Sequence, residues 1–190
     1  EWDVGNVLDM KFMLSRSYNF NMPICEWNVS KVKNMESMFE GCTKFNQNIN
    51  KWDVGKVKNM VSMFDNCINF NQKLDNWNVS NVTNMKYMFN NCTKFNMDIT
   101  NWDISKVTDM QGMFSGVNLG EKFYDNMLLK WSDLNTLEKL IFNAGESQYC
   151  KASEARDKLI NEKKWTIVDD GQFCVEPFII RVKVEAAFGN

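Results

Sequence analysis

The 190-residue sequence contains no histidine and only 2 prolines and 9 glycines. The absence of histidine excludes Ser-His-Asp triads, histidine general bases and histidine metal ligands. No apolar run reaches the roughly 18–20 residues that a membrane-spanning helix needs, and no signal peptide is recognisable. The 22 basic and 24 acidic residues give a formal net charge of -2. This balance does not fit a basic nucleic-acid-binding surface.

Asparagine, methionine, phenylalanine and tryptophan are abundant, with 26, 13, 14 and 7 residues, because the sequence repeats itself. Five tryptophans are spaced by 25 residues, and rows of valine, methionine and phenylalanine keep register with them. The tryptophan row is Trp2, Trp27, Trp52, Trp77 and Trp102. A fixed period of this length indicates an array of stacked units. Each unit buries its apolar side only against its neighbours, so the rows are expected to form one continuous core.

Within one unit, the spacing of apolar residues changes from that of a strand to that of a helix. Ile49, Trp52 and Val54 follow the spacing of a leucine-rich-repeat strand. Met60 and Phe64 then recur at the spacing of a helix. Residues that favour a helix N-cap precede this second segment, namely Asp9, Asn34, Asn59, Asn84 and Asp109. Residues that tolerate a left-handed turn follow it, namely Gly41, Asn66, Asn91 and Gly116, whereas the first unit has Arg16.

These patterns predict an α/β repeat solenoid with one short parallel strand and one short helix in each 25-residue repeat. The string from Trp77 to Phe89, followed by Phe95 and Asn96, resembles the surface-protein repeat of mycoplasma-type lipoproteins, which is related to BspA-like leucine-rich-repeat proteins. The resemblance covers residues 1–121. It implies a right-handed leucine-rich-repeat-like coil on the cell surface or secreted, a role in adhesion, and no catalytic residues.

The repeat weakens in its fifth copy, and the C-terminal residues have a different pattern. A solenoid needs a divergent end segment to cover its core, and residues 122–174 are expected to form an α/β cap. Helices are predicted near residues 123–131 and 153–160, and strands near 137–142 and 165–168. Residues 175–190 contain a further strand signal. That strand either pairs with the cap or begins a following domain. We favour the following domain, because a single strand without partners is not stable.

The six cysteines fall into groups with different expectations. Cys42, Cys67 and Cys92 share one repeat position and are predicted to be a buried row of small side chains. Three thiols in a line do not supply a closed tetrahedral metal site, so no metal is expected. Cys150 and Cys174 lie outside the repeat on either side of the predicted helix and strand of the cap. A disulfide between them is expected, the alternative being two reduced thiols.

One row of polar residues is predicted to point outward between the inward tryptophan and valine rows. It consists of Asp3, Asn28, Asp53, Asn78 and Asp103. Their carboxylate and amide groups suit hydrogen bonding to sugar hydroxyls or peptide groups, and solenoids bind partners on such extended faces. The alternative is a solvated face whose side chains bond one another. A flat row offers too few convergent oxygens for calcium, and carboxylates two coils apart do not form a glycosidase pair.

A second candidate patch consists of four lysines at the predicted turn between strand and helix. They are Lys31, Lys33, Lys56 and Lys58. Neighbouring lysines suit an anionic glycan or a lipid headgroup, and the alternative is an ordinary solvated face.

The sequence therefore predicts a non-catalytic interaction module, without a cofactor, that binds a host or neighbouring-cell surface protein or glycan. The second hypothesis is a passive spacer that presents neighbouring domains. We do not expect an enzyme, because there is no phosphate-binding glycine loop, no nucleophile motif and no acid pair. We expect a monomeric part of a larger modular protein, located at the cell surface or secreted.

Overall fold

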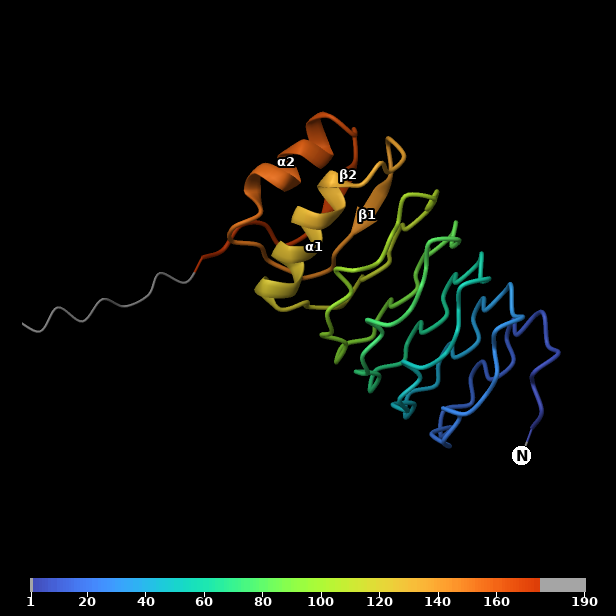
Figure 1. The fold of residues 1–190 in the computed structure, drawn as a ribbon. Coiled ribbons are helices and arrows are strands. Elements are labelled where there is room, and N and C mark those ends of the chain that lie inside the picture. The colour runs from blue at the N-terminus through green and yellow to red at the C-terminus, as the bar shows by residue number, and fades with distance from the viewer. Residues whose placement is uncertain (1, 175–190) are drawn as a thin grey trace, which may run out of the picture.

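The computed structural model describes residues 2–174, so the strand predicted in residues 175–190 lies outside the described residues. Figure 1 shows open coils stacked side by side, followed by a segment with two helices. We call the coils coil 1 (2–25), coil 2 (26–50), coil 3 (51–75), coil 4 (76–100) and coil 5 (101–119). The segment that follows, residues 120–174, is called the cap. It contains α1 (Glu121–Asp133), β1 (Ile141–Asn143), α2 (Ser153–Asn161) and β2 (Thr166–Val168).

Backbone hydrogen bonds join each coil to the next one with a fixed register. The N–H groups of Met35, Ser37, Phe39 and Gly41 donate to carbonyls 24 residues further on, at distances of 2.7–2.9 Å. The same four bonds recur between every neighbouring pair of coils. All four point the same way, with the N–H directed toward the next coil and the C=O toward the previous one. The stack is therefore polar along its axis.

The predicted helix in each repeat is wrong, because residues 2–119 contain no helix. Residues 34–42 instead form consecutive tight turns, in which the Met38 N–H donates to the carbonyl of Met35 at 3.2 Å. Ser37 and Gly41 have φ values of 51° and 72°, which no right-handed helix accommodates. The turns still place apolar side chains inward at intervals of three and four residues, which explains why the pattern resembled a helix.

The residues predicted to be helix N-caps have a related role. Asn59 Oδ1 accepts the N–H of Val61 at 3.1 Å, as an N-cap does, but it opens a turn. Single-residue parallel bridges between neighbouring coils also fall on this row, which is Asp9, Asn34, Asn59, Asn84 and Asp109. The strand predicted around Trp52 and Val54 is not found, because these residues make local turns and coils pair several residues later. The predicted left-handed turns are confirmed at Gly41, Asn66, Asn91 and Gly116, and Arg16 adopts the same conformation.

The apolar rows meet in one continuous core inside the coils. The Met, Val and Phe side chains of the repeated rows are almost completely buried in coils 2–5, and Trp52 is 3 % exposed. Phenylalanine rings of successive coils stack, with centroid distances of 5.6 Å for Phe39–Phe64 and 5.4 Å for Phe64–Phe89. Offset stacking adds to the burial of these rings. Each coil therefore depends on its neighbours for most of its apolar contacts.

The cap continues the register of the coils. The carbonyl of Asn143 in β1 accepts the N–H of Phe114 in coil 5 at 3.0 Å, and β1 pairs in parallel with β2 at an offset of 25 residues. Trp165 Nε1 donates to the carbonyl of Leu137 across 28 residues, as Trp52 Nε1 does to Ile24. The cap thus adds two modified coils in which α1 and α2, packed side by side in Figure 1, replace the extended return.

Candidate functional site

The outward row predicted from the sequence is exposed along the stack. Its members are Asp3, Asn28, Asp53, Asn78 and Asp103. In each, Oδ1 accepts the backbone N–H two residues further on, at 3.0–3.2 Å. This Asx turn fixes the side chain and occupies one oxygen. The second oxygen or the amide nitrogen of each residue is left available on the surface.

Members of this row lie close to each other across coils. A Cβ atom on Gly55 would lie 3.2 Å from Asp53 Oδ1 and 3.6 Å from Asn78 Nδ2, and Gly5 has the same arrangement with Asp3 and Asn28. Side chains from neighbouring coils therefore share the space above each glycine. The row therefore forms an ordered strip of alternating carboxylate and carboxamide groups, which we call the Asx strip.

The carboxylate of Asp103 is held in its charged form. Hydrogen bonds from the hydroxyl and the backbone N–H of Ser105 lower the pKa of Asp103, and Lys106 acts in the same direction. Groups that donate to a carboxylate favour the ionised form. This end of the strip therefore remains negatively charged at mildly acidic pH.

The four lysines of the second patch are all exposed. Lys33 and Lys58 are neighbours, because the Lys58 N–H donates to the Lys33 carbonyl at 2.9 Å. Lys31 Nζ donates to Asn6 Oδ1 of the preceding coil at 2.7 Å. The ion pairs found within residues 2–174 include none of Lys31, Lys33, Lys56 and Lys58. Lys31 and Lys56 follow Asn28 and Asp53 of the strip by three residues. The patch therefore lies beside the strip along the chain, and its ammonium groups are exposed.

The repeated cysteines are buried as predicted. The thiols of Cys42, Cys67 and Cys92 donate to the carbonyls of Leu14, Phe39 and Phe64 at 2.8–3.1 Å. Burial raises the pKa of Cys42 to about 11 and raises the pKa of the other two thiols as well. The structure also contains the expected Cys150–Cys174 disulfide. Within residues 2–174, no group of three or more acidic or cysteine side chains is arranged to hold a metal ion.

Two anchoring carboxylates of the cap were not predicted. Asp125 of α1 is 5 % exposed and accepts the N–H groups of Cys150, Lys151 and Ala152 at 3.0–3.1 Å. It thereby anchors the segment that leads into α2 to the neighbouring helix α1. The sequence carried one signal for it, an aspartate beside the apolar face of a predicted helix, since buried carboxylates need partners.

The second anchor is Asp169, whose side chain is 2 % exposed. It accepts two hydrogen bonds from Arg156, at 2.8 and 3.0 Å, and one from the Tyr124 hydroxyl at 2.6 Å. Burial and the neighbouring Asp169 raise the pKa of Tyr124. The cluster therefore joins α1, α2 and the residue that follows β2.

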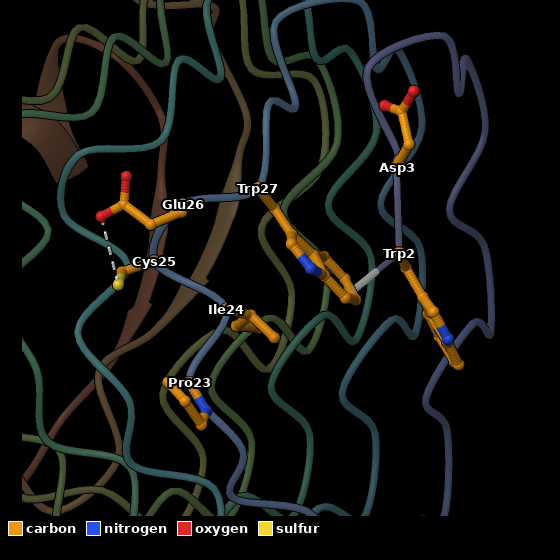
Figure 2. Close-up of a pocket in the computed structure, with 7 residues that line it drawn as sticks. All are labelled: Trp2, Asp3, Pro23, Ile24, Cys25, Glu26 and Trp27. Atoms are coloured by element: carbon orange, nitrogen blue, oxygen red, sulfur yellow. Dashed lines mark hydrogen bonds between the residues drawn. The ribbon is translucent and has the colours of Figure 1, made fainter.

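A groove lies at the N-terminal end of the stack (Figure 2). It is lined by Trp2, Asp3, Pro23, Ile24, Cys25, Glu26 and Trp27. The rings of Trp2 and Trp27 stack with centroids 6.0 Å apart, and the Cys25 thiol lies 3.5 Å from Glu26 Oε1. No sequence argument singled out this groove, which shares Asp3 with the end of the Asx strip.

Comparison with known proteins gives one match. The model of a family described as Mycoplasma protein of unknown function, DUF285, matches residues 1–75 and 48–148, which together cover the five coils and part of the cap. No curated protein and no solved structure matches the sequence. In residues 2–174, neither helix is long and apolar enough to cross a membrane.

Proposed function

Since the chain belongs to the Mycoplasma family of unknown function DUF285, we propose from its geometry that it is a non-catalytic interaction module that binds a protein or glycan at a cell surface. The observation that carries the proposal is the ordered strip formed by Asp3, Asn28, Asp53, Asn78 and Asp103. Each side chain is fixed by its own backbone turn, so little conformational entropy is lost when a ligand binds.

The strip and the lysines beside it offer complementary hydrogen-bonding groups. Carboxylate and carboxamide groups accept from sugar hydroxyls and peptide N–H groups, and the free amide N–H and lysine ammonium groups donate. The spacing of the strip follows the stacking of the coils, so a ligand with its own repeated polar groups suits it best. An extended glycan or the edge of a protein surface has that character.

We further propose that the stack is a leucine-rich-repeat-like solenoid related to BspA-like surface proteins. The 25-residue register, the parallel bridges and the continuous core support this fold class. The Cys150–Cys174 disulfide supports a cell-surface or secreted location, because disulfides persist in oxidising compartments.

A binding comparison between two matched double variants tests the interaction site. D103N/K106Q alters the strip and the lysine beside it in coil 5, and D98N/K94Q alters the same number and sign of charges in coil 4, outside the strip. The pairs match closely, because Asp103 and Asp98 each accept an N–H two residues later. Lys106 and Lys94 each donate to an asparagine one coil earlier. Asparagine retains the Oδ1 acceptor, so both variants are expected to fold.

Both variants and the unaltered protein are screened against glycan and extracellular-matrix protein arrays. A ligand whose binding falls at least tenfold in D103N/K106Q but not in D98N/K94Q supports the proposed site. A ligand bound equally by all three proteins places the site elsewhere. Absence of any ligand favours the second function, a passive spacer, which the unbroken hydrogen bonding and core of the stack also suit.

A further inference from the structure

The N-terminal face of coil 1 lacks the covering that every later coil receives. In coil 2, the carbonyls of residues 34, 36, 38 and 40 accept N–H groups from coil 1. The equivalent carbonyls in coil 1 are those of Asp9, Lys11, Met13 and Ser15. Within residues 2–174, no group donates to them. Because these four bonds all point one way, the face presents four unpaired carbonyls. The Leu8 N–H, whose equivalents Lys33 and Lys58 donate to the preceding coil, also finds no acceptor within residues 2–174.

The core is also open on this face. Trp2 is 62 % exposed, whereas Trp52 at the same repeat position is 3 % exposed. Val7, Met13, Phe20 and Trp27 are only partly buried, although the residues at their positions in coils 3 and 4 are buried. These side chains occupy the core positions of the repeat, so the surface they expose on this face is apolar.

One donor on this face lacks the acceptor that its equivalents have. Trp52, Trp77 and Trp102 each donate Nε1–H to a carbonyl 28 residues earlier, at 3.1 Å. For Trp27 Nε1, no acceptor is found within the described residues. The groove of Figure 2 is lined by both rings of the Trp2–Trp27 pair.

We propose that the N-terminal face of coil 1 is a docking surface for a further coil of the same 25-residue repeat, added in the same direction. Such a coil supplies four N–H donors at alternate residues, a carbonyl for Trp27 and an indole for Trp2. The four N–H donors recur at all four existing contacts between coils. Stacked tryptophan rings occur at three of these contacts, and three indole N–H groups bond a carbonyl 28 residues earlier. The docking surface therefore continues an interface that the molecule already uses.

A second copy of the chain does not meet these requirements. Two copies placed face to face would set carbonyl acceptors against carbonyl acceptors, which cannot bond each other. The opposite end of the stack is covered, because β1 accepts the N–H of Phe114 and pairs beside Met110. A coil of the repeat supplies N–H donors for the four carbonyls of coil 1, a carbonyl for Trp27 Nε1 and a ring that stacks on Trp2.

The test adds one coil in register. A copy of residues 26–50 is fused directly before Glu1, so that Glu1 takes the place that Lys51 has after Asn50. The tryptophan in the added copy is changed to phenylalanine, so that the original tryptophans alone report. A matched control carries the same 25 residues in scrambled order. Acrylamide quenching is measured for each protein and for its Trp2→Phe variant, because the difference isolates Trp2.

We expect the in-register coil to reduce the quenching of Trp2 severalfold and to raise the midpoint of thermal unfolding by about 5 °C or more. The scrambled coil should change neither value. Equal quenching and equal midpoints in the two fusions would overturn the proposal. It would also be overturned if sedimentation of the unfused protein showed a dimer in which Trp2 is protected, since a second copy would then be the occupant.

Discussion

At the scale of single residues, the thiols illustrate how position in the coil controls chemistry. Cys42, Cys67 and Cys92 lie in the core and bond to carbonyls of the preceding coil. Cys25 occupies a different repeat position and is partly exposed. Only a thiolate reacts readily with alkylating reagents, so burial and the raised pKa protect the three repeated thiols.

We therefore predict that iodoacetamide at pH 8 labels Cys25 in the native protein and leaves the three core thiols unlabelled. All four should react in denaturant without reductant, while the disulfide pair stays protected. Mass spectrometry of tryptic peptides measures the labelling. Modification of Cys67 in the folded protein at a rate near that of Cys25 would contradict the buried row.

Asp65 gives a second prediction, on pH dependence. Burial raises the pKa of this carboxyl, and Glu40 adds to the shift, against hydrogen bonds from Asn90 and Ser62. Because the pKa of Asp65 is higher in the folded protein than in the unfolded chain, the protonated carboxyl stabilises the fold, and this stabilisation is complete below the unfolded-state pKa. It is lost as the pH rises through the folded-state pKa. At pH 7 the ionised Asp65 therefore reduces stability.

Asp65→Asn should raise the free energy of unfolding at pH 7 by about 0.5 kcal/mol, the usual size for a partly exposed site. Asparagine keeps the acceptor for Asn90 and already occupies this position in coil 4. Urea unfolding at pH 7 and pH 3 measures the difference between variant and parent. The gain should shrink at pH 3, where Asp65 is protonated, and a gain that grows instead would refute the sign.

At the scale of the structural element, the turns of residues 34–42 and their equivalents replace a helix. Two residues of each segment, four apart, have positive φ, as Ser37 and Gly41 do. The position of Ser37 is filled by Phe12, Ser62, Tyr87 and Gly112 in the other coils. Gly112 is needed there because a Cβ atom on it would lie 2.3 Å from two carbons of the Tyr87 ring. The size of a residue at this position therefore depends on the residue one coil earlier.

Gly112→Ser should cost about 2–3 kcal/mol, from the clash with Tyr87 and the loss of glycine at φ 66°. Adding Tyr87→Ser removes the ring and recreates the Ser37–Ser62 pair of coils 2 and 3. The double variant should recover most of the loss. Urea unfolding of the two single variants and the double variant measures the coupling, and strictly additive losses would show that the two positions do not interact.

The same element shows where prediction from sequence succeeded and failed. The period, the inward rows and the left-handed residues such as Asn66 followed from side-chain type and spacing. The helix did not, because Met60 and Phe64 keep helical spacing in a chain of tight turns. Nothing in the residue type of Ser62 indicates its positive φ. The backbone there is held by a hydrogen bond from the Ser62 N–H to the Lys86 carbonyl of the next coil, which local spacing does not reveal.

At the scale of the whole molecule, the cap was predicted better than the coils. Its helices and strands contain enough local periodicity to be recognised, and they lie close to the predicted ranges. The anchors Asp125 and Asp169 were missed because their partners lie 13–45 residues away. The Asx strip was predicted to point outward, but the backbone bonds that fix it depend on turns that spacing alone does not reveal. The binding role of the strip stays a prediction.

The stacking order gives the last prediction, a difference between the middle and the end of the stack. Trp52→Ala should cost about 3–5 kcal/mol, because it opens a cavity in a closed core and removes the bond to the Ile24 carbonyl. Trp2→Ala should cost under about 1 kcal/mol, because Trp2 is 62 % exposed and stacks on one side only. Urea unfolding followed by far-ultraviolet circular dichroism measures both, and equal losses would contradict a stack whose coils depend on neighbours on both sides.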